Sequence, residues 1–185
     1  MVAREGVTGG FAGLYPVLRA MEAAGRIRRG YFVAGLGAAQ FAAPGADERL
    51  RQREPAESDE PDVLVLAATD PANPYGTALP WPETPHVPAR PQRAAGARVI
   101  LDRCALCGYL GRTGRHLTTF LPETEPERGR TLLVLARALA GLSQPGAPVY
   151  LTQIDDRPPS DSPLAESLRA AGFTATTRGY LHRHA

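Results

Sequence analysis

An acid, an amide and an aromatic ring follow a run of apolar residues near the middle of the chain. In the stretch Ala68–Gly76, read ATDPANPYG, these are Asp70, Asn73 and Tyr75, and Trp81 follows soon after. A carboxylate at a strand end can activate water as a general base, and aromatic rings can stack on a flipped base. The pattern predicts Asp70 as a catalytic candidate, and Tyr75 and Trp81 as base-stacking candidates.

The same stretch is also typical of a stiff corner. Asp-Pro and Asn-Pro dipeptides start turns because their side chains bond nearby backbone N–H groups, and Gly76 supplies a positive φ. Turn propensity alone favours the stiff corner over a functional site. A second acidic pair, Asp155 and Asp156, follows Gln153 in the pattern Q-x-D, but the Pro-Pro pair after it favours a solvated turn.

Composition excludes several kinds of chemistry. All 21 basic residues of this 185-residue chain are arginine. Without lysine the chain can form neither a standard Walker ATP site nor a Schiff base, which excludes PLP enzymes and amine-type DNA lyases. The net charge of +2 permits nucleic-acid binding without requiring it. No apolar run approaches the ~20 residues needed to span a bilayer, and no secretory leader is visible, so we expect no membrane partner and a cytoplasmic location.

The two cysteines, Cys104 and Cys107, have C-x-x-C spacing. A structural zinc needs four ligands, and no second such pair exists. We therefore predict two buried thiols and no metal site. His182 and His184, close to the end of the chain, are predicted to lie in a disordered tail.

The first segment reads as a helix followed by a hairpin. Leu14, Leu18 and Met21 recur at helical spacing, Pro16 is placed in the first turn, and Gly25 is placed as the C-cap. Two strands then flank a turn at residues 34–37. A helix leading into a hairpin is the second half of a winged helix, so the chain is expected to begin inside such a domain.

The remaining segments predict an α+β fold. We expect a partial winged helix over 1–50, a linker over 51–61, a mostly antiparallel β unit with a Pro-rich loop over 62–122, and an α/β layer over 123–185. The β unit begins with a buried strand, DVLVLAAT, and continues as a meander. The C-terminal layer contains a leucine-striped helix, the strand PVYLTQID, a helix capped by Ser162, and a final strand or hairpin.

A partial winged helix would contact DNA through its recognition helix and its wing. Arginine pairs with phosphate oxygens in a bidentate manner, so the basic and aromatic residues here are the DNA-binding candidates. These candidates are Tyr15, Arg19, Arg26, Arg28, Arg29 and Tyr31. Direct DNA contact requires Arg26, Arg28 and Arg29 on one exposed face; the alternative is that the module only packs.

Three blocks of sequence carry a family resemblance. GGFAGLYPVLRAMEAAGRIRRGYFVAGLGAAQFAAPGA, VLAATDPANPYGTALPWP and DSPLAESLRAAGF, in this order, resemble the C-terminal region of the large helicase-related (Lhr) family. These are superfamily 2 ATP-dependent DNA helicases linked to DNA repair. The resemblance implies a helicase core elsewhere that carries ATP and magnesium, whereas this chain carries no cofactor.

The resemblance implies an accessory region that binds single-stranded or forked DNA non-specifically, or that docks on the helicase core of the same polypeptide or complex. The family's C-terminal region is also similar to winged-helix DNA glycosylases. The first alternative is therefore a lysine-free, monofunctional uracil glycosylase that uses Asp70 or a neighbouring acid. A second alternative is a scaffold that forms homo-oligomers through the leucine stripe at 132–142.

Overall fold

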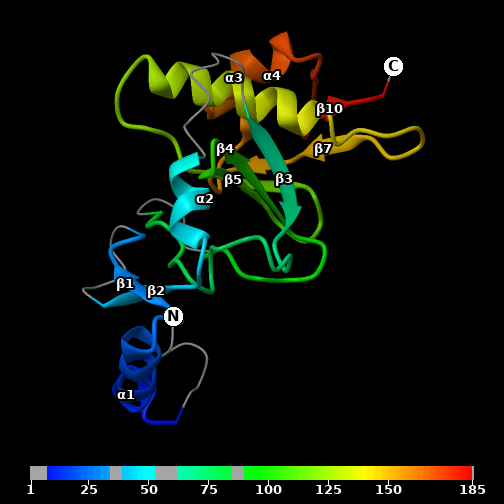
Figure 1. The fold of residues 1–185 in the computed structure, drawn as a ribbon. Helices are drawn as coiled ribbons and strands as arrows, with labels where there is room; N and C mark the ends of the chain where they lie inside the picture. Colours follow the sequence, from blue (N-terminus) through cyan, green and yellow to red (C-terminus); the bar gives the residue numbers. More distant parts are fainter. Residues whose placement is uncertain (1–7, 34–38, 53–61, 85–89, 185) are drawn as a thin grey trace. The chain divides into compact units, whose positions relative to one another are not determined.

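A computed structural model describes residues 8–33, 39–52, 62–84 and 90–184 of the chain (Figure 1). The described residues form two compact units. The first holds the described residues up to 52 together with Thr77–Leu79, and the second holds those from 62 onward without these three. Helices and antiparallel strands occur in separate runs, which confirms the α+β class. No described helix has the length and apolar character needed to cross a bilayer.

The first unit confirms the predicted helix and hairpin. Helix α1 (Gly10–Ala23) precedes strands β1 (Arg28–Gly30) and β2 (Gln40–Ala42), which pair antiparallel. The short helix α2 (Ala46–Gln52) follows. The predicted hairpin turn at 34–37 and the linker beyond residue 52 lie outside the described residues.

The two ends of α1 test two predictions. Ala24 is the C-cap, and Gly25 directly after it has a φ of 70° and donates its N–H to the Glu22 carbonyl, so the predicted glycine ends the helix one position beyond the C-cap. The placement of Pro16 in the first turn is wrong, because the helix begins at Gly10 and Pro16 is an interior residue. Gly9 and Gly10 both have positive φ values, so the chain enters the helix earlier than the proline suggested.

The second unit contains a five-stranded sheet in the order β3-β4-β5-β6-β8. The predicted meander is confirmed, since β4 (Arg98–Asp102), β5 (Ala105–Leu110) and β6 (His116–Thr119) pair antiparallel. Strand β3 (Val63–Ala67) was predicted to be buried, but it is an edge strand with Leu64 49% exposed. The unbroken apolar run did not distinguish an edge strand from a central one.

The predicted strand PVYLTQID is divided between two sheets. Strand β7 (Val149–Leu151) pairs with β10 (Gly179–His182), whereas β8 (Gln153–Ile154) pairs in parallel with β6. Strand β9 (Thr174–Thr176) completes the final hairpin with β10, as predicted. The tail prediction for His182 is wrong, because this residue pairs with Val149 and its ring contacts Phe173.

One core joins the segments expected to form two units, 62–122 and 123–185. Helices α3 (Glu127–Ala140) and α4 (Ala165–Ala170) lie side by side in Figure 1, and α3 contacts β4 and β5. The short 3-10 helix η2 (Pro159–Asp161) precedes α4. Leu135 and Leu139 are fully buried in this core. The leucine stripe is therefore core rather than the exposed patch that the scaffold alternative required.

Gly179 gives the fold a direct test. Its φ is 146°, and an added Cβ would overlap the Leu151 carbonyl oxygen. Backbone atoms of a paired strand cannot move aside, so we expect Gly179→Ala to lower the free energy of unfolding by about 3 kcal/mol or more. Gly146, with a φ of 77° and open space, is the matched control, and Gly146→Ala should cost about 1–2 kcal/mol. Equal losses in chemical denaturation would contradict the pairing of β10 with β7.

Candidate functional site

Three of the six DNA-binding candidates in the first unit are exposed and unpaired. Tyr31 is 81% exposed, and the side chains of Arg19 and Arg26 are also exposed. Within the described residues none of the three makes a side-chain hydrogen bond or ion pair. These three side chains are therefore available for contact with a ligand.

The other three candidates are engaged inside the unit. The Arg29 guanidinium donates to the Tyr15 hydroxyl at 3.3 Å and lies 3.3 Å from the Glu22 carboxylate. The Tyr15 ring also packs edge-on against Phe41. Arg28, the neighbour of Arg29 on β1, donates to Asp47 at 2.9 Å. Because neighbours on a strand point to opposite faces, Arg28 and Arg29 do not share the single exposed face that direct DNA contact through Arg26, Arg28 and Arg29 required.

Asp47 of α2 makes Arg28 part of the packing. Burial has the largest single effect and raises the pKa of the Asp47 carboxyl, but the Arg28 guanidinium and the backbone N–H groups of Asp47 and Glu48 together hold this pKa below its usual value. Arg51 lies 3.9 Å from the same carboxylate, one helical turn away. Arg28 therefore has a structural partner, and its contact with DNA stays a prediction.

The loop after β3 has the geometry of a stiff corner. Asn73 is fully buried, and its side-chain amide donates to the Ala68 carbonyl at 2.9 Å and accepts from the Tyr75 N–H at 3.0 Å. The Asp70 carboxylate accepts from the Ala72 N–H at 2.8 Å, which is an Asx turn. Asp70 thus bonds within its own turn, and its catalytic role stays a prediction.

Arg93 holds this corner from the far end of the Pro-rich segment. Its guanidinium donates to the carbonyls of Asn73 at 2.8 Å, Asp70 at 2.9 Å and Thr69 at 3.1 Å, and more weakly to that of Tyr75. A planar group with five donors suits a turn whose carbonyls converge. Sequence reasoning missed Arg93, since nothing in its local pattern indicates a partner about 20 residues upstream.

The two base-stacking candidates pack against each other. The rings of Tyr75 and Trp81 are stacked with centroids 6.2 Å apart, and Trp81 meets Tyr109 edge-on at 5.6 Å. The Tyr75 hydroxyl also accepts a hydrogen bond from the Leu106 N–H. Both rings pack against a buried cluster that includes Val99. Their geometry gives them a packing role, and base stacking stays a prediction.

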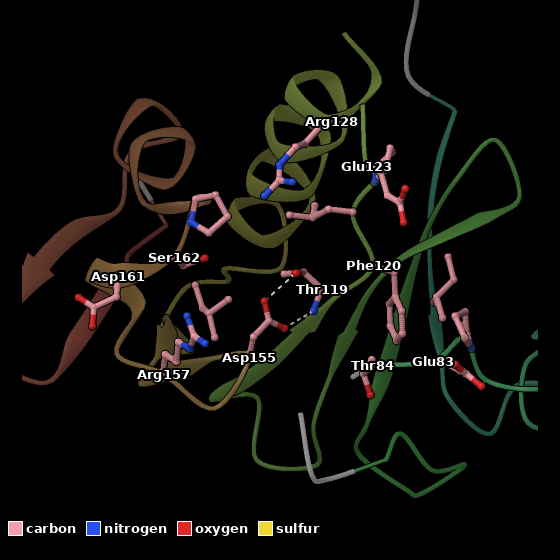
Figure 2. Close-up of a pocket in the computed structure, with 16 residues that line it drawn as sticks. Glu83, Thr84, Thr119, Phe120, Glu123, Arg128, Asp155, Arg157, Asp161 and Ser162 are labelled. Carbon is pink, nitrogen blue, oxygen red and sulfur yellow. Dashed lines mark hydrogen bonds between the residues drawn. The ribbon is translucent and has the colours of Figure 1, made fainter. Parts of the chain in front are cut away.

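A pocket of about 660 Å³ lies elsewhere in the second unit (Figure 2). Asp155 is at its centre: one carboxylate oxygen accepts from the Thr119 N–H and the other from the Thr119 hydroxyl, both at 2.7 Å. Asp155 and Asp156 have φ values of 52° and 59° in the tight turn between Ile154 and Arg157. This turn fixes the direction of the Asp155 carboxylate.

The pocket combines groups that suit a polar, planar ligand. Figure 2 shows Phe120 on one side of Asp155 and Arg157 on the other, with Arg128 of α3 nearby. A carboxylate, a phenyl ring and guanidinium groups can accept a hydrogen bond, stack and bind phosphate, respectively. Gln153 of the Q-x-D pattern lines a different hollow, so the pattern does not converge on this pocket.

The other lining residues of the pocket come from several elements. They are Pro82, Glu83, Thr84, Leu106, Leu121, Pro122, Glu123, Ile154, Asp161, Ser162 and Pro163. The sequence analysis weighed Asp155 only as part of a solvated turn, and it did not single out Thr119, Phe120, Arg128 or Arg157. No local signal could have found them, because the pairing of β6 with β8 brings Thr119 beside Asp155, and Arg128 comes from a separate element, α3.

The cysteines differ in environment. Cys107 is buried as predicted; its thiol donates to the Ile100 carbonyl, and burial raises its pKa to about 12. The burial prediction for Cys104 is wrong, because Cys104 is exposed in the turn between β4 and β5 with a φ of 67°. Among the described residues no group of three or more His, Cys, Asp or Glu side chains could hold a metal ion.

Comparison with known proteins gives consistent matches. Residues 1–62 match the family model for the large helicase-related protein, winged-helix domain. A Mycolicibacterium smegmatis protein named "Lhr helicase/ probable uracil glycosylase" is 42% identical over 185 residues. The Escherichia coli "Lhr helicase/uracil glycosylase" is 35% identical over 180 residues. Each match covers 96% of this chain, which spans 12% of the length of these relatives.

Substitutions of Asn73 and Asp70 test whether the loop after β3 has a structural role. Asn73→Ala leaves the Ala68 carbonyl and the Tyr75 N–H without their partner, so we expect it to lower the free energy of unfolding by roughly 2–4 kcal/mol. Asp70→Ala, which removes one exposed turn bond, should cost about 1 kcal/mol or less. Denaturant titration followed by tryptophan fluorescence measures both. A loss for Asn73→Ala no larger than that for Asp70→Ala would contradict the structural role of the loop.

Proposed function

The chain is related along 96% of its length to the C-terminal region of the large helicase-related (Lhr) family, and we propose that it binds nucleic acid as an accessory region of a DNA helicase. Its partner in this proposal is the helicase core, in the same polypeptide or the same complex. The chain has no lysine, so ATP hydrolysis at a standard Walker site belongs to that core.

One observation carries the binding proposal: Tyr31 is 81% exposed and shares its unit with Arg19 and Arg26, which are unpaired. An exposed aromatic ring lacks the favourable free energy of burying its apolar surface, and stacking on an unpaired base would supply it. Arginine binds phosphate oxygens without reading sequence. This combination suits non-specific contact with single-stranded or forked DNA.

A triple variant, Arg19→Ala/Arg26→Ala/Tyr31→Ala, tests this contact. On a labelled single strand, loss of two phosphate contacts should reduce the salt slope of log K by about 1.4. Loss of the stacked base should weaken binding by a further 1–3 kcal/mol or so. Fluorescence anisotropy of the whole chain over a salt series measures both quantities.

The matched control is Arg90→Ala/Arg137→Ala, which removes the same charge from two other exposed positions. It should retain the wild-type slope. An unchanged triple variant would remove the first unit from the binding surface. Absence of binding by the folded wild-type chain at low salt would overturn the proposed function altogether.

Uracil excision is a second candidate function, and the fixed Asp155 carboxylate in its pocket favours it. Both relatives carry uracil glycosylase in their names. The pocket supports Asp155 as the acid of this alternative better than Asp70, whose carboxylate closes an Asx turn. The remaining lone pairs on the Asp155 oxygens are free to orient a water molecule.

In this candidate reaction, water attacks C1′ of the deoxyribose and the bond from C1′ to N1 of uracil breaks. Asp155 accepts the proton from water, and uracil leaves as an anion that is protonated afterwards. Phe120 would stack on the extruded base, and Arg128 and Arg157 would hold the flanking phosphates. Without lysine no Schiff base forms, so the product is an intact strand with an abasic site.

Asp155→Asn tests this candidate because asparagine also tolerates the positive φ of this turn. We expect excision from a uracil-containing oligonucleotide, read after alkaline cleavage, to fall about 100-fold or more, with DNA binding retained. Asp156→Asn changes the adjacent carboxylate outside the pocket and should remain active. Loss of excision only in Asp70→Asn would return the role to Asp70. Absence of uracil excision by the wild-type chain would overturn the glycosylase candidate and leave the nucleic-acid-binding proposal standing.

A further inference from the structure

A third hollow in the second unit, about 600 Å³ in volume, is rich in arginine, and its strands β4, β5 and β7 are labelled in Figure 1. Arg98 comes from the start of β4, and Arg112 and Arg115 come from the turn between β5 and β6. We call it the arginine hollow. No aspartate or glutamate is among the described residues that line it.

The three guanidinium groups are not compensated. All three residues are exposed, and within the described part of the chain their side chains make no ion pair or hydrogen bond. Arg28 and Arg130, by contrast, each lie within 4.0 Å of a carboxylate. Like charges gathered around one hollow repel each other, and arginine cannot relieve this by losing its proton. A bound anion would remove the repulsion.

The backbone holds these arginines in place. Gly96, with a φ of 84°, allows the chain to approach Arg112 so closely that an added Cβ would lie 3.0 Å from the Arg112 carbonyl oxygen. The turn is closed by the Gly111 N–H, which donates to the His116 carbonyl at 2.8 Å. The Arg115 carbonyl accepts from Thr152 at 2.9 Å and Gln153 at 3.3 Å. The backbone positions that carry these arginines are therefore fixed by hydrogen bonds and close packing.

The hollow also offers an aromatic and apolar surface. Tyr150 of β7 lines it, half-buried, and its hydroxyl lies 3.3 Å from the Thr176 hydroxyl. Leu110 and Val149 are buried side chains on the same lining. Guanidinium groups beside an aromatic ring are the two elements that bind single strands, through phosphates and through bases.

We propose that the arginine hollow binds the sugar-phosphate backbone of single-stranded nucleic acid, with a base against Tyr150. A hollow of about 600 Å³ accepts nucleotides of one strand, whereas a duplex exposes its phosphates around a much wider cylinder. The inference rests on the proposed nucleic-acid binding and adds a contact in the second unit that is independent of Tyr31.

The test compares two variants of the whole chain that lose equal charge. The first is Arg98→Ala/Arg112→Ala/Arg115→Ala, and the control is Arg90→Ala/Arg137→Ala/Arg183→Ala, at exposed positions outside the hollow. Three phosphate contacts on a single strand correspond to a salt slope of about 2.1, or about a 20-fold loss of affinity between 50 and 200 mM salt. The first variant should lose this part of the slope for a labelled oligothymidylate, and the control should keep it.

Two further measurements show whether a loss of binding in the alanine variant results from misfolding. Arg98→Lys/Arg112→Lys/Arg115→Lys preserves the charges and should retain most of the slope. Photocrosslinking of the unmodified chain to a 4-thiothymidine strand should map to the peptide that contains Tyr150.

The outcomes separate this inference from the proposed function. An unchanged slope in the alanine variant, an equal loss in the control, or crosslinks confined to other peptides would overturn the arginine hollow while nucleic-acid binding stands. Tighter binding of a duplex than of a single strand, lost in the alanine variant, would overturn its assignment to single strands. Absence of any binding by the wild-type chain would overturn both.

Discussion

The Arg115 carbonyl is the acceptor on which the second unit depends. It accepts N–H groups from both Thr152 and Gln153, and at this point the chain leaves one sheet and enters the other. Strand β7 before the point pairs with β10, and β8 after it pairs with β6. If residues 149–154 formed one continuous strand of the β7–β10 sheet, β8 would not pair with β6, and Asp155 would lie away from Thr119. The same carbonyl thus joins two sheets, orders the pocket and anchors one residue of the arginine hollow.

Features set by nearby residues could be predicted from the sequence. The meander and the final hairpin follow from alternation, and the glycine that ends α1 follows from its position after the helical pattern. Ser162 accepts from the Leu164 N–H, but its prediction as the N-cap of the last helix is wrong, because α4 begins at Ala165 with Leu164 as its N-cap. Features set by distant partners could not be predicted. The division of PVYLTQID depends on a carbonyl some 37 residues upstream, and the pocket depends on the resulting pairing. Asp70 was a candidate because the residues that surround it in the sequence form a recognisable pattern. The neighbours of Asp155 are distant in the sequence and meet it only in the folded chain.

A chain without lysine makes arginine serve several purposes, and its environment distinguishes them. Arg93 donates to carbonyls that converge in a corner, and Arg28 neutralises a carboxylate with little exposure. In both cases the charge has a structural partner. Arg98 and its neighbours in the arginine hollow have none within the described residues, although they are held by a well-bonded turn. Unpaired guanidinium groups beside a fixed backbone are what the proposed binding of phosphates requires.

Strand β6 connects the two features of the second unit that bear on nucleic acid. Arg115 precedes it and contributes to the arginine hollow, and Thr119 ends it and holds Asp155. Arg115 and Thr119 are four positions apart along extended chain, which is about 13 Å. A backbone bound at the hollow could therefore reach the pocket with only a short run of nucleotides between them. Because β6 is paired on both sides, the spacing between Arg115 and Thr119 is fixed. Phosphates bound at the arginine hollow would therefore determine which base of the strand reaches the Asp155 pocket.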